Sequence, residues 1–241
     1  MAKEGPLYPN QPLREVATEV RFRGDLSIEN IRAIFQKEIN SDYPVLKAPG
    51  AQQGVAPSLQ PFRFETECGR SGVQVAINSI SYFTRDYPGY DVFMRAFEPV
   101  VNAFFGLLGP VNSTRIGWRY INAIPFTRED GLLPLSRIFE DNDIFGNSLS
   151  LETDQLSTFL VKSFDGFRLN IKLESTTPAS SLDEEVIILD IDAFQEFKPD
   201  VAMNDQETIS VIRHMHDAAR SVFENLISDG YREFLKGGEN E

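Results

Sequence analysis

Apolar and polar residues alternate along several short stretches of this chain. The strongest alternation covers residues 114–126, where apolar and aromatic side chains fall on one side and arginines and a glycine on the other: Ile116, Trp118 and Tyr120 against Arg115, Gly117 and Arg119. Period-two alternation rich in β-branched and aromatic residues predicts a half-buried strand. The same pattern predicts strands over residues 13–23, 62–68, 73–83, 149–151, 157–164 and 167–174. Residues 185–193 also predict a strand, and their near-continuous apolar run is typical of a central strand covered on both faces.

Three segments instead repeat their apolar residues at intervals of three and four, which predicts amphipathic helices. The first covers residues 28–39, and we expect the side chain of Ser27 to cap its N-terminus. The second covers residues 90–108 and contains Pro99, so we expect a kink or a break near its middle. The third covers residues 205–235 and would be about 45 Å long at ~1.5 Å per residue. Residues 135–140 predict a short helix at most.

These elements predict an α+β fold with a mostly antiparallel sheet in two similar halves, helices packed on one face and a long C-terminal helix. The halves are residues 1–126 and 127–241, either as separate domains or as one continuous domain. Between two predicted elements, residues 42–61 contain four prolines and show no periodicity. A connection of this length is typical of a mobile linker or a lid, and we predict a mobile linker.

The charge balance restricts the class of partner. The chain has 241 residues, 36 acidic against 23 basic side chains and a formal net charge of −13. Nucleic acid binding depends on clustered Lys and Arg that displace counterions, so the phosphate backbone is not expected to be the main ligand. No apolar run approaches the length of a membrane span, and we predict a cytoplasmic protein without membrane contact.

Few side chains suggest reaction chemistry. The single cysteine, Cys68, excludes an internal disulfide and alternates with Phe62 and Phe64, so we expect its thiol to face the core. His214 and His216 stand two positions apart on a predicted helix, where their rings point in nearly opposite directions and do not share a metal ion. No motif of a common enzyme class is present. We therefore predict no catalytic residue and no cofactor. Together these observations favour a protein without enzymatic activity.

Two pairs of charged residues remain as candidate sites. Asp190 and Asp192 share one face of a predicted strand, where they either hold a hard cation or face solvent, and the second arrangement is the commoner. We predict no metal site. Arg115 and Arg119 share a strand face about 13 Å apart at ~3.3 Å per residue. Gly117 between them leaves backbone open to a ligand or a partner chain.

The first predicted strand offers carboxylates for these arginines. Glu15 and Glu19 share one of its faces, so neighbouring strands would form a ladder of Arg–Glu pairs. The alternative is an anion pocket lined by Arg115 and Arg119. We predict the ladder, with Arg119 at least half buried and paired with Glu15 or Glu19, because a guanidinium beside the core loses hydration unless it is paired.

Three motifs suggest a relationship with known sequences: L-Y-P-N-Q-P-L-R-E-V-A-T-E-V-R-F from residue 7, R-I-G-W-R-Y-I-N from residue 115 and H-M-H-D-A-A-R-S-V-F-E-N-L-I-S-D from residue 214. In this order they resemble a sporadically distributed prokaryotic family of unknown function, over residues 7–234. The resemblance implies no catalytic residues. It directs attention to Glu15, Arg115, Arg119, Tyr120 and Asn122, and the family's patchy distribution implies genes on mobile or defence-related elements.

The resulting functional prediction is a non-enzymatic binding or adaptor protein that acts with a protein partner, in a bacterial defence or toxin-neutralising module. The alternative is an enzyme or sensor that binds a small anionic ligand through an arginine-lined sheet face. Association with further copies of the same chain is compatible with either prediction. The candidate binding residues are Arg115, Arg119, Tyr120, Asn122, Glu15 and Glu19.

Overall fold

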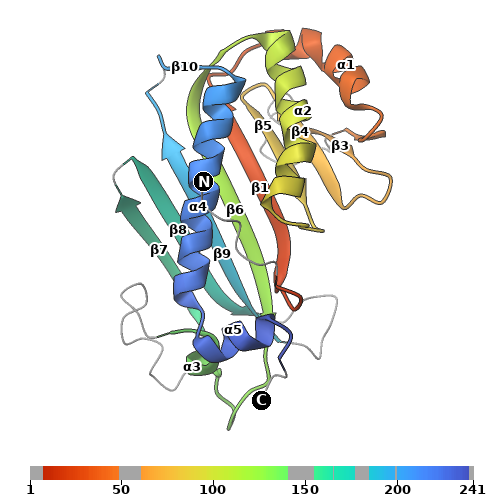
Figure 1. Ribbon diagram of the computed structural model, residues 1–241. Helices are drawn as coiled ribbons and strands as arrows, with labels where there is room; N and C mark the ends of the chain where they lie inside the picture. Colours follow the sequence, from red (N-terminus) through yellow and green to blue (C-terminus); the bar gives the residue numbers. More distant parts are fainter. Residues whose placement is uncertain are drawn as a thin grey trace. The chain divides into compact units, whose positions relative to one another are not determined.

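Figure 1 shows the computed structural model of the chain, which describes residues 8–48, 61–140, 155–164, 166–176, 185–198 and 200–238. This part of the chain contains five helices and a large, open, antiparallel sheet. The predicted α+β class is therefore confirmed. None of the described helices combines the length and the apolar character that a membrane-spanning helix needs.

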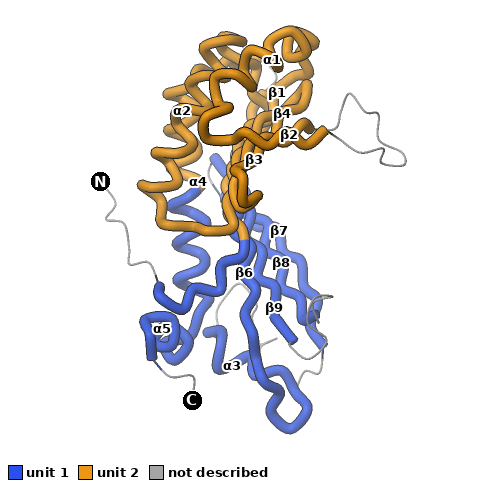
Figure 2. The backbone as a smooth tube through the Cα atoms, turned by 90° about the vertical axis from the view of Figure 1, so that its right-hand side faces the viewer, with its two compact units in different colours: residues 1–14, 119–193, 216–241 blue, residues 15–118, 194–215 orange. Residues whose placement is uncertain are grey.

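The chain groups into two compact units, each made of segments that are distant in sequence. Unit 1 comprises residues 1–14, 119–193 and 216–241, and unit 2 comprises residues 15–118 and 194–215 (Figure 2). Four elements contribute residues to both units: β1 (Leu13–Phe22), β6 (Val111–Pro125), β9 (Val186–Glu196) and α4 (Asp205–Leu226). The predicted boundary after residue 126 stays a prediction.

In unit 2 the strand order is β2-β3-β4-β5-β1-β6. The strands not yet given bounds are β2 (Val45–Lys47), β3 (Phe62–Glu65), β4 (Ser71–Ala76) and β5 (Ser79–Thr84), and the two-residue strand β10 (Ala202–Met203) pairs with the start of β6. Successive pairs from β2 to β5, and β5 with β1, are antiparallel. Helices α1 (Ser27–Ile39) and α2 (Tyr90–Leu108) lie on one side of these strands (Figure 1).

Aromatic side chains fill the space between the helices and the strands of unit 2. Trp118 of β6 is fully buried and lies 4.6 Å, between ring centroids, from Phe93 of α2. Phe35 of α1 makes edge-on contacts with Phe64 of β3 and Phe104 of α2, at 6.0 and 5.8 Å. Such edge-on geometry matches the charge distribution of the rings and adds to the free energy gained by burying them. The helical period of the apolar residues therefore places both helices on this core.

In unit 1 the strand order is β6-β9-β8-β7, with β7 (Ser157–Phe164) and β8 (Phe167–Thr176) as an antiparallel hairpin. The second half of α4, the short helix α3 (Leu135–Ile138) and helix α5 (Asp229–Leu235) complete the unit. Its core is mostly aliphatic, with Phe139 as a fully buried aromatic residue, and includes these fully buried residues from strands and helices: Ile124, Ile171, Leu189, Ala219, Leu226 and Leu235.

The C-terminal region contains two helices where the sequence predicts a single one. Helix α4 ends at Leu226, and Ile227 forms an isolated β-bridge with Phe139. Ser228 has extended backbone angles (φ −66°, ψ 158°), and its Oγ accepts a hydrogen bond of 3.0 Å from the amide of Tyr231. This is the geometry of a helix N-cap, so α5 begins anew after Ser228.

Three further expectations about local structure are wrong. The segment 73–83 is two strands, because residues 77 and 78 form a turn between β4 and β5. Strand β3 ends at Glu65, so Cys68 lies in the following turn and is exposed. Ser27 does not cap α1; instead its amide and its hydroxyl both donate to Asp25, at 2.8 and 2.6 Å.

Helix α2 is continuous through Pro99, so the helix is not broken at this residue. The helix ends at Gly109, whose φ of 81° lies in the left-handed region that glycine adopts readily and whose amide donates to the carbonyl of Phe105 at 2.8 Å. Part of the predicted linker is ordered, since Val45–Lys47 forms β2 against β3. Residues 49–60 of that linker and the predicted strand at 149–151 lie outside the described residues.

Candidate functional site

Strand β6 separates the predicted site residues onto two faces of the sheet. Trp118 points toward α2, and Tyr120 lies 6.3 Å, between ring centroids, from His216 of α4. Because side chains alternate along a strand, Arg115 and Arg119 point to the opposite face, which we call the outer face. The six candidate residues therefore do not form one site.

On the outer face of unit 2, five charged side chains form two ion-paired groups. The guanidinium of Arg115 lies 3.2 Å from the carboxylate of Glu19, which also receives a 2.6 Å hydrogen bond from Arg21. Arg85, directly after β5, donates to Glu15 at 3.1 Å. We call these five residues the arginine–glutamate cluster. The predicted ladder of Arg–Glu pairs is confirmed for Arg115 with Glu19.

Two buried phenylalanines lie beneath the arginines of this face. The guanidinium carbon of Arg115 is 4.3 Å from the ring centroid of Phe194, and those of Arg63 and Arg85 are 4.9 and 5.4 Å from that of Phe83. These distances fall within the range of cation–π contacts. Phe83 and Phe194 are only 3% and 6% exposed. The arginines thus cover apolar rings with their planar groups; the side chain of Arg85 is 48% exposed, whereas that of Arg115 is only 17% exposed.

In unit 1, Arg119 pairs with Asp190 of β9. The pair is bidentate, with Nε to Oδ1 at 2.8 Å and Nη2 to Oδ2 at 2.5 Å. The side chain of Arg119 is 49% exposed and that of Asp190 is 14% exposed. The predicted partner, Glu15 or Glu19, is therefore wrong. The physical reason is that β6 has a neighbour on each side, and this arginine reaches β9 and not β1.

Tyr120 and Asn122 lie on the inner face and belong to the core of unit 1. Asn122 is 3% exposed and its amide nitrogen donates to the backbone carbonyl of Leu189 at 3.1 Å. Tyr120 is 7% exposed, and its neighbour His216 is 4% exposed, with its Nδ1 3.0 Å from the carboxylate of Asp217. The buried hydrogen bond of Asn122 thus links β6 to β9, and the ring contact between Tyr120 and His216 packs β6 against α4.

The two aspartates of β9 are engaged in protein contacts. Asp190 holds Arg119, and the amide of Asn170 on β8 donates to Asp192 at 3.4 Å. Within the described residues, no three His, Cys, Asp or Glu side chains come together in a way that could hold a metal ion. The sequence showed Asp190 as a carboxylate on a strand face. It could not show that Arg119 is its partner, because that depends on β9 lying beside β6.

The first and last of the three sequence motifs contact each other in unit 1. The hydroxyl of Tyr8 donates to Glu224 of α4 at 2.8 Å, and the side-chain amide of Asn10 donates to the carbonyl of Phe234 at 2.8 Å. Arg232 of α5 also binds the Glu224 carboxylate. Burial, and next the hydrogen bond to Glu224, raise the pKa of the Tyr8 phenol above its usual value. These motif residues thus attach the N-terminal segment to the C-terminal helices.

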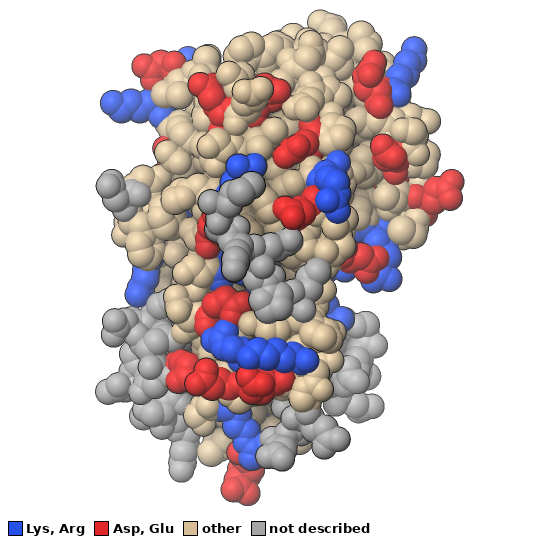
Figure 3. All heavy atoms as spheres, in the orientation of Figure 1, with Lys and Arg blue, Asp and Glu red and all other residues tan. Residues whose placement is uncertain are grey.

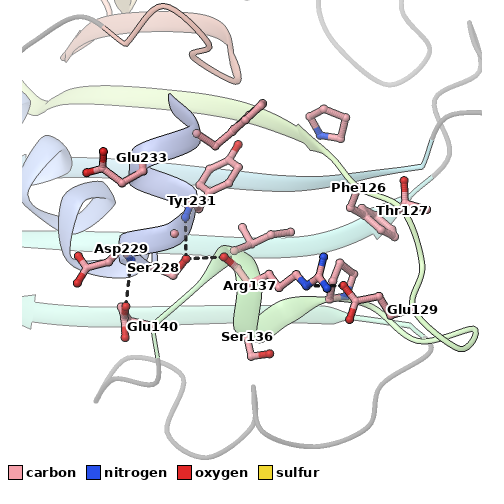
Figure 4. A pocket seen from close by; sticks show the side chains of 15 residues that line it. Phe126, Thr127, Glu129, Ser136, Arg137, Glu140, Ser228, Asp229, Tyr231 and Glu233 are labelled. Carbon is pink, nitrogen blue, oxygen red and sulfur yellow. Dashed lines mark hydrogen bonds and ion pairs between the residues drawn. The ribbon is translucent and has the colours of Figure 1, made fainter. Parts of the chain in front are cut away.

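A cavity of about 940 Å³ in unit 1 lies between the start of α5 and the segment around α3 (Figure 4). Several of its lining side chains are acidic, but they contact protein groups. Glu140 accepts a hydrogen bond from the amide of Asp229 at 3.1 Å, and Glu129 lies 2.7 Å from Arg137. Ser228 donates to the carbonyl of Arg137. The contacts of Glu140 and Ser228 attach the start of α5 to the segment around α3, and we assign the cavity a structural role.

Charges of both signs are interspersed on one face of the described residues. Figure 3, in the orientation of Figure 1, shows Lys and Arg side chains beside Asp and Glu on this face.

Comparisons with known proteins give no matching family model and no matching curated protein. The resemblance indicated by the three motifs therefore stays a prediction.

Proposed function

We propose that this chain is a non-enzymatic binding or adaptor protein and that a protein partner contacts the arginine–glutamate cluster. The observation that carries the proposal is the setting of Arg115, which is ion-paired to Glu19 and stacked on the buried ring of Phe194. Arginine and aromatic side chains are enriched at the centres of protein interfaces. Because Arg115 is already held by both contacts, it loses little side-chain entropy when a partner binds.

The same pairing favours a protein partner over a small anion. A small anion would have to bind Arg115 beside the Glu19 carboxylate, 3.2 Å away, and so meet a like charge at short range. A protein surface can present donors to Glu15 and Glu19 and acceptors to the arginines at once, as complementary interfaces do. Action within a bacterial defence or toxin-neutralising module is part of the proposal and is supported by the sequence motifs alone. Action in the cytoplasm is also part of the proposal, and it is supported by the lack of a long apolar run in the sequence.

The test replaces exposed members of the cluster and compares them with a matched control. In the cluster variant, Arg21→Glu and Arg85→Glu remove two ion pairs in which the arginines are 53% and 48% exposed. In the control, Arg137→Glu and Lys236→Glu remove two ion pairs of unit 1 with 61% and 47% exposure. Both variants change the net charge equally, and exposed pairs contribute little to stability, so both should fold.

Each protein is used to capture partners from a lysate of the source organism, and recovered proteins are quantified by mass spectrometry. We expect the wild type and the control to recover the same partner and the cluster variant to lose it. Recovery of the same partner by the cluster variant would contradict the proposal. Titration of the wild type with inorganic phosphate provides the second readout, because a rise in its melting temperature would support the anion-binding alternative.

A further inference from the structure

Strand β7 forms the edge of the sheet in unit 1. It follows β8 as the last strand of the order β6-β9-β8-β7, and within the described residues no strand pairs with its other side. All eight of its residues are exposed or half-buried. At ~3.3 Å per residue this edge is about 26 Å long. The free N–H and C=O groups of such an edge can pair with another strand.

The side chains of β7 make this edge strand apolar on the face that points away from the core. Leu160 lies opposite the buried Ile171 of β8 and so shares the core face. Phe159 and Val161 point to the other face, where they are 63% and 56% exposed. Large apolar side chains at this exposure, gathered on one strand, are typical of an interaction surface. By contrast, the terminal strand of unit 2, β2, has three residues and ends in Lys47.

We propose that β7 pairs antiparallel with β7 of a second copy of this chain, about a two-fold axis at Leu160. Along an edge strand, the N–H and C=O groups that point outward belong to every second residue. Two-fold pairing must therefore join odd-numbered residues to odd-numbered residues and even-numbered residues to even-numbered ones. An axis at Leu160 satisfies this condition. It places Phe159 of each copy directly opposite Val161 of the other, and an aromatic beside a β-branched residue is a favourable cross-strand pair.

The same register keeps like charges apart. Lys162 is the single charged residue of β7, and the axis at Leu160 places it opposite Thr158 of the second copy. The two lysines are then four positions apart along the strands, about 13 Å at ~3.3 Å per residue. In this register the edge strand is self-complementary in its side-chain pairs and in its charges. A second copy of the chain is therefore the partner that we propose for β7.

The size and the charge of the protein set the strength of this dimer. One pair of eight-residue strands covers less than the ~1,600 Å² of a standard interface, so the dimer is weak and its population depends on concentration. Each copy carries a net charge of −13, and the resulting long-range repulsion is screened as ionic strength rises. Added salt therefore strengthens the dimer, whereas it weakens a complex held by ion pairs of the arginine–glutamate cluster.

Sedimentation velocity over the micromolar concentration range tests the proposal, with reducing agent present because Cys68 is exposed. The wild type is compared with Val161→Lys and with Val92→Lys, a matched change at a 40% exposed valine of α2. We expect wild type and Val92→Lys to dimerise, more strongly at higher salt, and Val161→Lys to dimerise roughly tenfold or more weakly. A wild type that stays monomeric, or a Val161→Lys variant that dimerises normally, overturns the proposal.

Cysteine cross-linking tests the register independently of that substitution. In a Cys68→Ser background, Leu160→Cys places two thiols directly across the axis, within reach of a disulfide, whereas Lys162→Cys places them about 13 Å apart. We expect oxidation to give a covalent dimer for Leu160→Cys and not for Lys162→Cys. Equal yields from the two variants, or a higher yield from Lys162→Cys, overturn the pairing of β7 with β7 about Leu160.

Discussion

Replacing Arg119 by methionine tests how the outer face of unit 1 is held together. Arg119 donates two hydrogen bonds to Asp190, and the aspartate is the more buried partner, at 14% against 49% exposure. Methionine keeps the apolar part of the arginine side chain and removes the charge. The variant therefore leaves a mostly buried carboxylate without its bidentate partner, and we expect it to be less stable than the wild type.

The expected magnitude lies between two known limits. Exposed ion pairs contribute about 0.2–1 kcal/mol, and removing one partner of a buried pair costs about 3–5 kcal/mol. Because one partner here is half-exposed and the other is mostly buried, we expect a loss of about 1–3 kcal/mol. For a chain of this size that corresponds to a fall in melting temperature of about 2–12 °C. The control Arg21→Met, where the arginine is 53% exposed and Glu19 keeps Arg115, should lose at most about 1 kcal/mol.

Urea unfolding followed by far-ultraviolet circular dichroism measures these differences, provided that the slopes of the transitions agree between variants. The double variant Arg119→Met/Asp190→Leu removes both charges and should recover most of the lost stability, since replacing both partners of a pair is often nearly neutral. The double-mutant cycle then isolates the coupling free energy. An Arg119→Met variant as stable as the wild type, or a double variant less stable than the single one, would contradict a stabilising role of the Arg119–Asp190 pair.

Two further predictions concern packing and pH. Gly72→Ala should destabilise the fold by about 1–3 kcal/mol in thermal melts, because its Cβ would lie 2.6 Å from the carbonyl oxygen of Phe64; Gly106→Ala, with open space around it, should not. The pKa of Tyr8 is raised by burial and by Glu224, so its stabilising contribution is full below about pH 10 and is lost as pH rises through the folded-state pKa. The wild type should therefore lose stability above that pH more steeply than Tyr8→Phe, and equal slopes would contradict this.

Elements bounded by strong local signals could be predicted from the sequence. Strand β7 and helix α2 have the bounds 157–164 and 90–108 that their alternation and helical period predict. Each pattern stops where a glycine follows closely, at Gly166 and Gly109, and both glycines adopt positive φ. In both places the sequence pattern and the local backbone geometry agree, so tertiary contacts did not shift the bounds of the element.

The missed boundaries lack such a signal or carry a weak one. Residues 77 and 78, an isoleucine and an asparagine, form the turn between β4 and β5 without glycine or proline, and the alternation runs across it. At the C-terminus, Ser228 followed by Asp229 is a helix-start signal inside a longer apolar period. There the bridge between Ile227 and Phe139 ends α4, and that contact is distant in sequence.

The composition of the outer face depended on strand order, which the sequence pattern does not contain. The alternation along β6 correctly separated Arg115 and Arg119 from the core. It could not show that Arg115 would reach Glu19 of β1 while Arg119 would reach Asp190 of β9. The ring of Phe194 beneath Arg115 was hidden for the same reason, because it comes from β9, which is far from β6 in the sequence.

In-cell photo-cross-linking tests most directly whether a protein partner contacts the arginine–glutamate cluster. A photoreactive amino acid replaces Arg21 in the cluster or, as a control, Val92 on α2, which is 40% exposed. We predict that illumination joins the same partner protein to the chain from position 21 and not from position 92. Cross-links to that partner from position 92 but none from position 21 would contradict it.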